Sequence, residues 1–537
     1  DACLLFRVGD FYETFGEDAV RASKILGITL TKRGAGSETE TALAGFPHHS
    51  INTYLPKLVK AGLRVAICDQ LEDPKMTKTI VKRGVTELVT PGVSMNDEVL
   101  HSKTNNFLAS IYFGKKAIGI SFLDVSTGEF LTAQGTEDYI DKLLQNFNPS
   151  EVLIPKNNKN DFKEIFGEEY HNFYLEDWVY KEDYAFETLT NHFQTVSLKG
   201  FGIEEDVASI IACGIVLYYL EETRHPNLAH LKGISKIHPL DYLFLDRFSI
   251  RNLELMENPQ SEGRSFVEVL DATKTPMGAR LLRKWTLFPL KDLEQIRFRH
   301  SIVSSFIQHK KWAKQASEIL QEMGDLERLI GKSATGRINP RELVQLKRSV
   351  ELLPRVKKSL SEINGLEVAN LGSQLTDQTE FLQHLKTWLN EDAPAQLVKG
   401  GVIAKGISAE LDELRGLSNS GKDYLIQIQQ REIQQTGISS LKISFNNVFG
   451  YYLEVTHTHK DKVPETWIRK QTLVNAERYV TPELKEYEEK ILGAEEKIYQ
   501  IEQQLFQELL NELQDYIAPM QVNGQIMAIL DCLTCFA

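Results

Sequence analysis

The stretch TPELKEYEEKILGAEEKIYQIEQQL, residues 481–505, predicts a long helix and decides how the second half of the chain is arranged. Thr481 is a suitable N-cap, Pro482 fits the first helical position, and Glu483 places negative charge at the positive end of the helix dipole. Apolar side chains then recur every seven residues, at Leu484, Ile491, Ile498 and Leu505, with Tyr487, Ala494 and Ile501 between them. This pattern predicts that the helix packs along a second long helix.

The segment before this helix supplies the partner. A helical pattern runs up to Gly437, and two strand-like runs follow it, LKISF (441–445) and YYLEVTH (451–457), around the turn-prone NNVFG. We therefore expect two antiparallel helical arms that are joined at their far end by a small strand-rich module.

The first half of the chain alternates between strand-like and helical runs. Strands are predicted at RVAICDQ (64–70) and TELVT (86–90), with a helix at INTYLPKLVKAG (51–62) before them. The expected fold class is multidomain, α/β followed by all-α. Its parts are an α/β domain at 1–92, a second α/β domain at 93–235, a helical core with the first arm at 236–421, the strand-rich module at 422–481, and the returning helix with the end of the core at 482–537.

Composition limits the class of protein. The chain has 537 residues and a formal net charge of −13, from 61 Lys and Arg against 74 Asp and Glu. This balance argues against a surface coated in nucleic acid, but local basic patches remain, such as Arg264 to His300 with eight basic and four acidic residues. Five scattered cysteines suggest no disulfide framework, and no apolar run approaches the ~20 residues that cross a bilayer. We expect a cytoplasmic protein without a membrane segment whose true N-terminus lies upstream of Asp1.

Three short motifs resemble chemical sites, but their surroundings do not support that interpretation. The triplet Gly331 to Ser333 lacks the glycine that a P-loop has five residues earlier. The pair His48 and His49 has no accompanying set of spaced ligands, and the pair Cys532 and Cys535 lies in an apolar run without a second pair. We interpret these residues as structural, and we predict no catalytic residue, no metal site and no cofactor in this chain.

The segment RVGDFYETF (7–15) contains one candidate site. If the alternation from Leu4 to Phe15 reflects a strand, Phe11 and Glu13 project from one face and Tyr12 from the other. Phe11 is then either a core aromatic or an exposed ring, with Tyr12 the better core candidate, and Glu13 is either a solvated carboxylate or a binding group.

The segment WIRKQTLVNAERYV (467–480) contains a second candidate site. Its polar and basic residues have only one nearby acid, Glu477, and they are Arg469, Lys470, Gln471, Asn475 and Arg478. Residues of this kind at the end of long arms suit phosphate contacts, although a solvated charged face is the commoner meaning of such a run.

Eight blocks along the chain resemble the MutS family of DNA mismatch-recognition proteins, in the order of that family. They are GDFYETFGEDA (9–19), LTKRG (30–34), AGFPHHSINTYLPKLVKAGLRVAICDQLEDP (44–74), LVTPG (88–92), RNLELMEN (251–258), TPMGARLLRKW (275–285), FNNVFGYYLEV (445–455) and RKQTLVNAERYVTPELKEYE (469–488). The resemblance names the expected parts as a mismatch-binding domain, a connector, a helical core with lever helices and a clamp between the levers.

The resemblance also implies a function. The chain would bind mismatched base pairs and small insertion or deletion loops in duplex DNA, with Phe11 stacking on the faulty base, Glu13 hydrogen-bonding to it and the clamp residues contacting phosphates. The family's ATPase domain, with its ATP and Mg²⁺, would lie beyond this sequence. The intact protein would be a homodimer in a bacterial cytoplasm, associated with the nucleoid, that recruits a MutL-type partner and the replication sliding clamp.

Two other functions remain open at this point. The chain could hydrolyse ATP itself, which the lack of a Walker motif opposes. It could also be a relative that embraces DNA junctions or scaffolds partners without reading mispairs, which the intact pair of Phe11 and Glu13 opposes.

Overall fold

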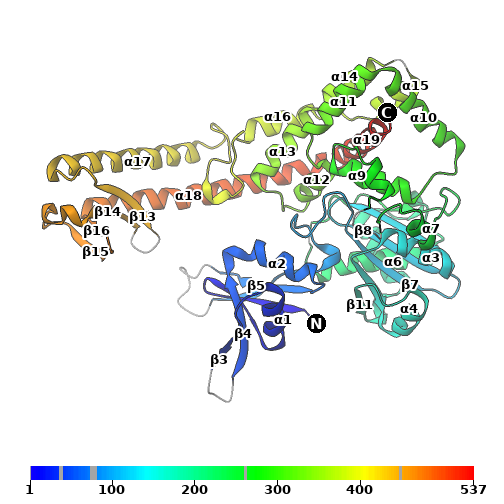
Figure 1. Cartoon of the computed structure of the whole chain (residues 1–537), viewed down its shortest axis with the longest axis horizontal. Coiled ribbons are helices and arrows are strands. Elements are labelled where there is room, and N and C mark those ends of the chain that lie inside the picture. Colours follow the sequence, from blue (N-terminus) through cyan, green and yellow to red (C-terminus); the bar gives the residue numbers. More distant parts are fainter. Residues whose placement is uncertain are drawn as a thin grey trace. The chain divides into compact units, whose positions relative to one another are not determined.

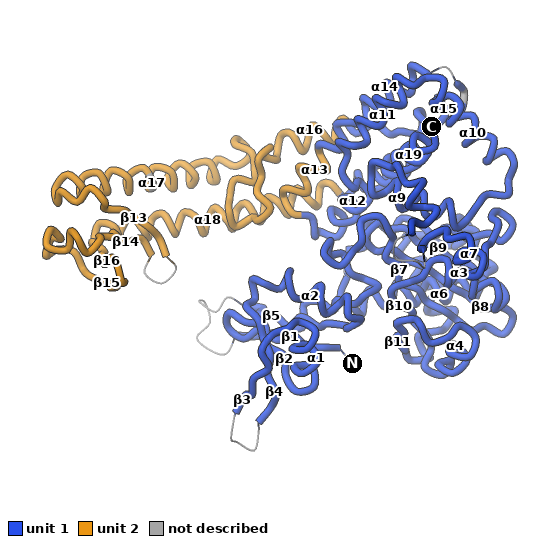
Figure 2. The backbone as a smooth tube through the Cα atoms, viewed as in Figure 1, with its two compact units in different colours: residues 1–338, 348–378, 514–537 blue, residues 339–347, 379–513 orange. Residues whose placement is uncertain are grey.

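The computed structural model of the chain describes residues 2–34, 40–72, 81–225, 227–258, 263–363, 365–446 and 450–537. These residues form two compact units, which Figure 2 draws in different colours. Unit 1 comprises residues 1–338, 348–378 and 514–537, and unit 2 comprises residues 339–347 and 379–513. None of the described helices is long and apolar enough to cross a bilayer.

Unit 1 begins with a six-stranded mixed sheet in the order β3-β4-β2-β1-β5-β6 (Figure 1). Its elements are β1 Cys3–Val8, β2 Phe11–Phe15, α1 Gly16–Leu26, β3 Thr31–Arg33, β4 Thr41–Pro47, α2 Ile51–Lys60, β5 Val65–Gln70 and β6 Arg83–Val89. β1 runs parallel to β5, and the other neighbouring strands are antiparallel. The alternation predicted from Leu4 to Phe15 is split between two strands, because Gly9, at φ +56°, lets the chain reverse in a two-residue turn.

One face of this sheet holds the core of the domain. Tyr12 and Phe46, which are cross-strand partners in β2 and β4, pack with Leu5 against Leu26 of α1 and Leu58 of α2. The predicted strands at 64–70 and 86–90 and the predicted helix at 51–62 are confirmed by β5, β6 and α2.

The second domain of unit 1 is a six-stranded sheet in the order β11-β10-β7-β8-β9-β12, with helices on both faces. Its elements are β7 Phe107–Phe113, β8 Ile118–Asp124, β9 Glu129–Gly135, α3 Glu137–Phe147, β10 Glu151–Pro155, α4 Lys159–Phe166, β11 Asn172–Leu175, α5 Glu182–Phe193, α6 Val207–Glu222 and β12 Ser235–Lys236. Ile140 and Phe162 belong to the core under α3 and α4, and Leu189 and Ile215 to the core under α5 and α6. The boundary expected after residue 235 falls within β12.

The remainder of unit 1 is helical. Its elements are α7 Arg247–Asn252, α8 Phe266–Leu270, α9 Pro276–Leu287, α10 Leu293–Gln308, α11 Lys310–Glu322, α12 Leu326–Ala334, α14 Leu353–Ser361, α15 Leu366–Ser373 and α19 Ile517–Cys535. The apolar helix α19 packs against α9, α10, α11 and α12, and its side chains Met520, Met527 and Leu530 are fully buried. The late segment of the chain thereby completes the core of the unit.

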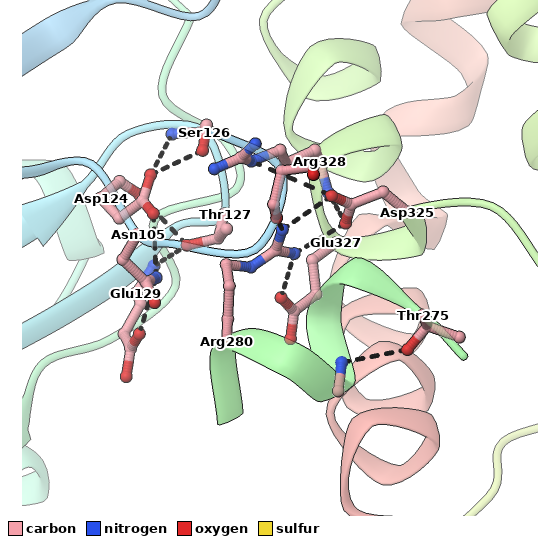
Figure 3. Close-up of polar contacts among 12 residues, drawn as sticks. Asn105, Asp124, Ser126, Thr127, Glu129, Thr275, Arg280, Asp325, Glu327 and Arg328 are labelled. Carbon is pink, nitrogen blue, oxygen red and sulfur yellow. Dashed lines mark hydrogen bonds and ion pairs between the residues drawn. The ribbon is translucent and has the colours of Figure 1, made fainter. Parts of the chain in front are cut away.

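A buried cation links helices within this core (Figure 3). Arg280, on α9, is 3% exposed and donates to both carboxylate oxygens of Asp325 and to Glu327, each at 2.7 Å. It also donates to the carbonyl oxygen of Ser102 at 2.9 Å. A buried guanidinium requires such compensation, because an unpaired charge in the interior is costly.

The same region connects the core to the segment before β7 (Figure 3). Arg328 donates to the carbonyl oxygen of Thr104 at 2.8 Å. Next to it, Asp124 at the end of β8 accepts from the Ser126 hydroxyl at 2.6 Å and from Asn105 at 2.9 Å. The bond from Arg328 fastens the second domain to helix α12, whereas the bonds of Asp124 lie within the second domain.

Unit 2 is built on two long helices that lie side by side, α17 Ala409–Thr436 and α18 Pro482–Glu512 (Figure 1). The Thr481 side chain accepts from the Leu484 N–H at 3.1 Å, so the predicted N-cap is confirmed. α17 ends at Gly437, as expected for the partner helix. The boundary expected between residues 421 and 422 falls within α17. The unit also contains most of α13 Pro340–Glu351 and all of α16 Thr379–Trp388.

The seam of α18 follows the predicted seven-residue repeat only in its first half. Leu484, Ile491 and Ile498 are buried, but Leu505 is only partly buried, so the prediction is wrong there. Because an α-helix needs about 3.6 residues per turn and a heptad repeat needs 3.5, seven residues fall short of two full turns, and the buried face drifts to Glu502 and Phe506.

A fully buried carboxylate lies on this drifted face. Glu502 accepts from the backbone N–H groups of Gly401 at 3.0 Å and Val402 at 3.3 Å, and it forms an ion pair with Arg415 of α17. The seam of the two helices is therefore partly ionic.

The module between the two helices is a four-stranded antiparallel sheet in the order β13-β14-β16-β15. Its strands are β13 Lys442–Asn446, β14 Gly450–Thr456, β15 Ile468–Thr472 and β16 Ala476–Val480. The predicted hairpin-like pair is confirmed as β13 and β14, and its turn at 447–449 lies outside the described residues. Sequence analysis did not identify β15 and β16.

Candidate nucleic-acid interface

Strand β2 separates the two aromatic residues of the first candidate site. Tyr12 is 4% exposed and joins the core, whereas Phe11 is 46% exposed on the opposite face. Glu13 lies on the same face as Phe11 and is partly exposed. Tyr12 is therefore the core aromatic of this strand, and the ring of Phe11 is accessible from solvent.

A hydrogen bond on the buried face of the sheet connects β2 to β5. The Tyr12 hydroxyl donates to Asp69 of β5 at 2.7 Å, and the Arg7 guanidinium lies 5.6 Å from the Tyr12 ring centre. Burial, together with this hydrogen bond to the carboxylate, raises the pKa of Tyr12 to about 12. The strand that presents Phe11 and Glu13 is thereby fixed to the sheet.

The open face of the sheet contains a shallow pocket beside these two residues. In the β2–β4 pair, Phe11 lies opposite Pro47, Glu13 opposite Gly45, and Phe15 opposite Leu43. The pocket has a volume of about 450 Å³, and its lining is Phe11, Glu13, Gly27, Ile28, Thr29, Thr31, Leu43 and Gly45. Sequence reasoning missed the β3 and β4 members of this lining, because the register of these strands could not be read from the sequence.

The Glu13 carboxylate has no hydrogen-bond or ion-pair partner among the residues that the structure describes. A carboxylate accepts hydrogen bonds but donates none. The pocket therefore combines an accessible aromatic face with an unused acceptor, an arrangement that suits a flat heterocycle carrying an N–H group on its edge.

The second candidate site lies in one hairpin of unit 2. Arg469, Lys470 and Gln471 belong to β15, Arg478 to β16, and Asn475 to the turn between these strands. The structure thus brings all five predicted residues together.

The positive charges of this hairpin differ in how far they are already paired. Arg478 donates to Glu454 at 3.1 Å and to Gln471 at 2.9 Å, and its guanidinium lies 4.3 Å from the Tyr452 ring centre. The stretch itself contains one acid, Glu477, and the fold adds a second, Glu454, from the neighbouring strand β14. The Arg478 guanidinium is therefore largely occupied by contacts within the sheet.

Arg469 and Lys470 are more available. Lys470 is exposed and occupies a β-bulge, so it has no partner in the ladder between β15 and β16. The Arg469 side chain is about half exposed and pairs with Glu477 at 3.3 Å. A hydrogen bond from the Tyr479 hydroxyl, together with the charges of Lys460 and Arg469, holds the pKa of Glu477 below its usual range.

Further basic residues lie beside the hairpin. The short helix η7 His457–Lys462 packs against β14 and β16 and carries Lys460, which pairs with Glu477 at 3.5 Å, and Lys462. The run HTHKDK was the signal for these residues, and sequence reasoning did not use it.

Two of the three short motifs lie in helices of the core. The triplet Gly331 to Ser333 lies inside helix α12. Cys532 is buried on α19, and both it and Cys535 are free thiols. Within the described residues, no group of three or more His, Cys, Asp or Glu is placed to hold a metal ion.

Fold and site together define a multidomain protein with two α/β domains and a helical core, and with a two-helix arm that carries a small basic sheet. The chain belongs to the MutS family. Residues 1–98 match the family model MutS domain I, residues 106–232 match MutS domain II, and residues 249–537 match MutS domain III.

Curated relatives support this assignment along the whole chain. The chain is similar to the DNA mismatch repair protein MutS of Flavobacterium psychrophilum, with 65% identity over 536 residues, and to those of Flavobacterium johnsoniae, with 64%, and Parabacteroides distasonis, with 54%. In each comparison all of this chain is covered, and it spans 62% of the length of the relative.

Proposed function

We propose that this chain recognises mispaired bases and small insertion or deletion loops in duplex DNA, as the first step of mismatch repair. The observation that carries the proposal is the pairing, on one face of β2, of an exposed Phe11 ring with a Glu13 carboxylate that has no partner among the described residues. The name of the relatives, DNA mismatch repair protein, supports it.

The two residues divide the work. An apolar ring that enters a base step opens the stack and kinks the duplex, which costs a few kcal/mol and less where pairing is already faulty. Phe11 would supply this wedge. Discrimination then follows from how easily the duplex deforms at a fault and not from its base sequence.

Glu13 would contribute selectivity more than affinity. A carboxylate near DNA phosphates is repelled unless it makes a specific hydrogen bond. A base in a normal pair does not offer its edge in the required position, whereas a displaced base does. The repulsion therefore weakens binding to matched DNA. At a mispaired base, the hydrogen bond to Glu13 offsets this repulsion and restores the affinity.

The hairpin of unit 2 would hold the backbone of the duplex. Arg469 and Lys470, which are exposed, are the strongest candidates for phosphate contacts, with Gln471, Asn475 and Arg478 beside them. Such contacts are electrostatic and independent of base sequence, so they add affinity without selectivity.

Features of the intact protein are carried over from the family resemblance. They are a homodimer, a DNA-dependent ATPase that uses ATP and Mg²⁺ outside this chain, contacts to a MutL-type partner and a sliding clamp, and a cytoplasmic, nucleoid-associated location. We expect no ATP binding by residues 1–537 themselves; saturable binding of labelled ATP by this chain would contradict that expectation.

A comparison of duplexes tests the proposal. Labelled duplexes that differ only in one mismatch are titrated with the protein at two salt concentrations, beside a four-way junction of equal length. Preference for the mismatch supports the proposal. Equal binding to matched and mismatched duplex, with preference for the junction, would favour the junction-embracing alternative.

A further inference from the structure

We infer that Gly45 is a specificity-determining position, which keeps open the space through which a base edge reaches Glu13. The inference rests on the proposed function and adds a residue from the neighbouring strand. Gly45 lies directly opposite Glu13 in the β2–β4 ladder and lines the same pocket as Phe11 and Glu13.

The ladder explains why this position controls the space. In an antiparallel pair, the side chains of directly opposed residues lie side by side, with their Cβ atoms about 4.5–5.5 Å apart. Any side chain at position 45 would therefore lie against the flank of Glu13. With a hydrogen in its place, the carboxylate is open toward β4.

The local geometry leaves little room for even one carbon. A Cβ added to Gly45 would lie 3.4 Å from Cγ of Glu13 and 2.8 Å from the backbone oxygen of Tyr12. The first distance places the methyl group in van der Waals contact with the Glu13 side chain. The second distance is too short, so the β2–β4 ladder would have to shift. A methyl group here would fill the part of the pocket between the carboxylate and β4.

Two other residues of the pocket lining come from β3 and β4. Leu43 is the next residue of β4 on the same face, and the Thr31 hydroxyl of β3 is used in a hydrogen bond to the Leu43 carbonyl oxygen at 3.0 Å. Leu43 therefore offers van der Waals surface, and the Glu13 carboxylate is an acceptor without a partner among the described residues. This combination selects a base whose N–H edge is displaced toward the sheet.

A pair of glycine variants tests the inference in the full-length protein. Gly84 is a second glycine of the same sheet, in β6, where an added Cβ would meet only the flexible Leu71 side chain, at 3.1 Å. Gly45→Ala should reduce the preference for a single mismatch on the order of tenfold, with binding to matched duplex and its salt dependence unchanged. Gly84→Ala should preserve the preference.

A third variant separates loss of space from strain in the sheet. Leu43→Phe enlarges a side chain in the same pocket without a new contact to the Tyr12 backbone, and it should also reduce the preference. If Gly45→Ala, with its melting temperature measured, retained the wild-type preference, the inference would be overturned. If that variant did not fold, an unchanged preference in Leu43→Phe would overturn it instead.

Failure of the inference can be told apart from failure of the proposed function. Wild-type protein without any mismatch preference contradicts the proposed function. Wild-type preference that is lost in Phe11→Ala but kept in Gly45→Ala and Leu43→Phe contradicts only the role of Gly45.

Discussion

Gly450, the first residue of β14, lies so close to Glu488 of α18 that an added Cβ would stand 2.1 Å from the carboxylate oxygen Oε2. The Glu488 side chain is nearly buried and accepts from the Tyr451 N–H at 2.5 Å and from Lys485 at 2.8 Å. The carboxylate thus connects the start of β14 to helix α18. Only glycine, here at φ +74°, fits between the strand and this carboxylate.

Gly450→Ala should therefore lower the free energy of unfolding by about 1–3 kcal/mol, because both the backbone conformation and the Glu488 contact become strained. The matched control is Gly493→Ala on the exposed side of α18, where nothing lies within 4 Å of an added Cβ. That change should stabilise the helix by about 1 kcal/mol. Urea unfolding monitored by circular dichroism measures both. Equal effects of the two substitutions would contradict the role given to Glu488.

Tyr12→Phe should reduce stability without affecting mismatch preference, since it removes the hydrogen bond to Asp69, worth about 1 kcal/mol. The effect should depend on pH. The folded-state pKa of Tyr12 is raised to about 12 from 10, so its stabilising contribution is complete below pH 10 and is lost as the pH rises toward 12. The stability difference between wild type and Tyr12→Phe, measured by urea unfolding, should be smaller at pH 11 than at pH 9. A constant or growing difference would argue against the buried hydrogen bond.

Arg469→Ala and Lys470→Ala should each weaken binding to matched and mismatched duplex alike and reduce the slope of log affinity against log salt by about one. Arg478→Ala should in addition lower the melting temperature, because Arg478 bridges Glu454, Gln471 and the Tyr452 ring. Fluorescence anisotropy over a salt series and thermal unfolding provide the two measurements. Loss of mismatch preference alone in Arg469→Ala or Lys470→Ala would show that these residues do not contact the backbone.

Glu13→Gln separates the effect of charge from the effect of hydrogen bonding in the pocket beside Phe11. The amide keeps an acceptor, adds a donor and removes the repulsion from phosphates. Overall affinity for DNA should rise while the ratio of mismatched to matched affinity falls. Both changes are measured in one pair of titrations, and a rise in affinity with an unchanged ratio would leave Glu13 as a solvated surface charge.

The sequence predicts the elements of this fold better than their details. The N-cap at Thr481, the end of α17 at Gly437 and the helical seam at Leu484 and Ile491 are local or periodic signals, and the structure confirms them. The seam fails at Leu505 because the drift of an α-helix against a heptad repeat accumulates with length.

The site was predictable only in part, for a similar reason. The opposite faces of Phe11 and Tyr12 follow from strand periodicity alone. The placement of Gly45 opposite Glu13 depends on the register between two strands separated by a long connection. The pairing of Arg478 with Glu454 depends on the register between β16 and β14, which belong to different hairpins. No short-range pattern in the sequence encodes either register.

The most direct test of the account compares wild type with Phe11→Ala on labelled duplexes that differ by one mismatch, at two salt concentrations, after confirming that the variant folds. The account predicts that Phe11→Ala loses most of the mismatch preference, on the order of 1–3 kcal/mol of stacking, and keeps the salt-dependent binding to matched duplex. Phe11→Tyr and Phe11→Trp should lose less, because a ring still stacks. Wild-type mismatch preference in Phe11→Ala would contradict the account.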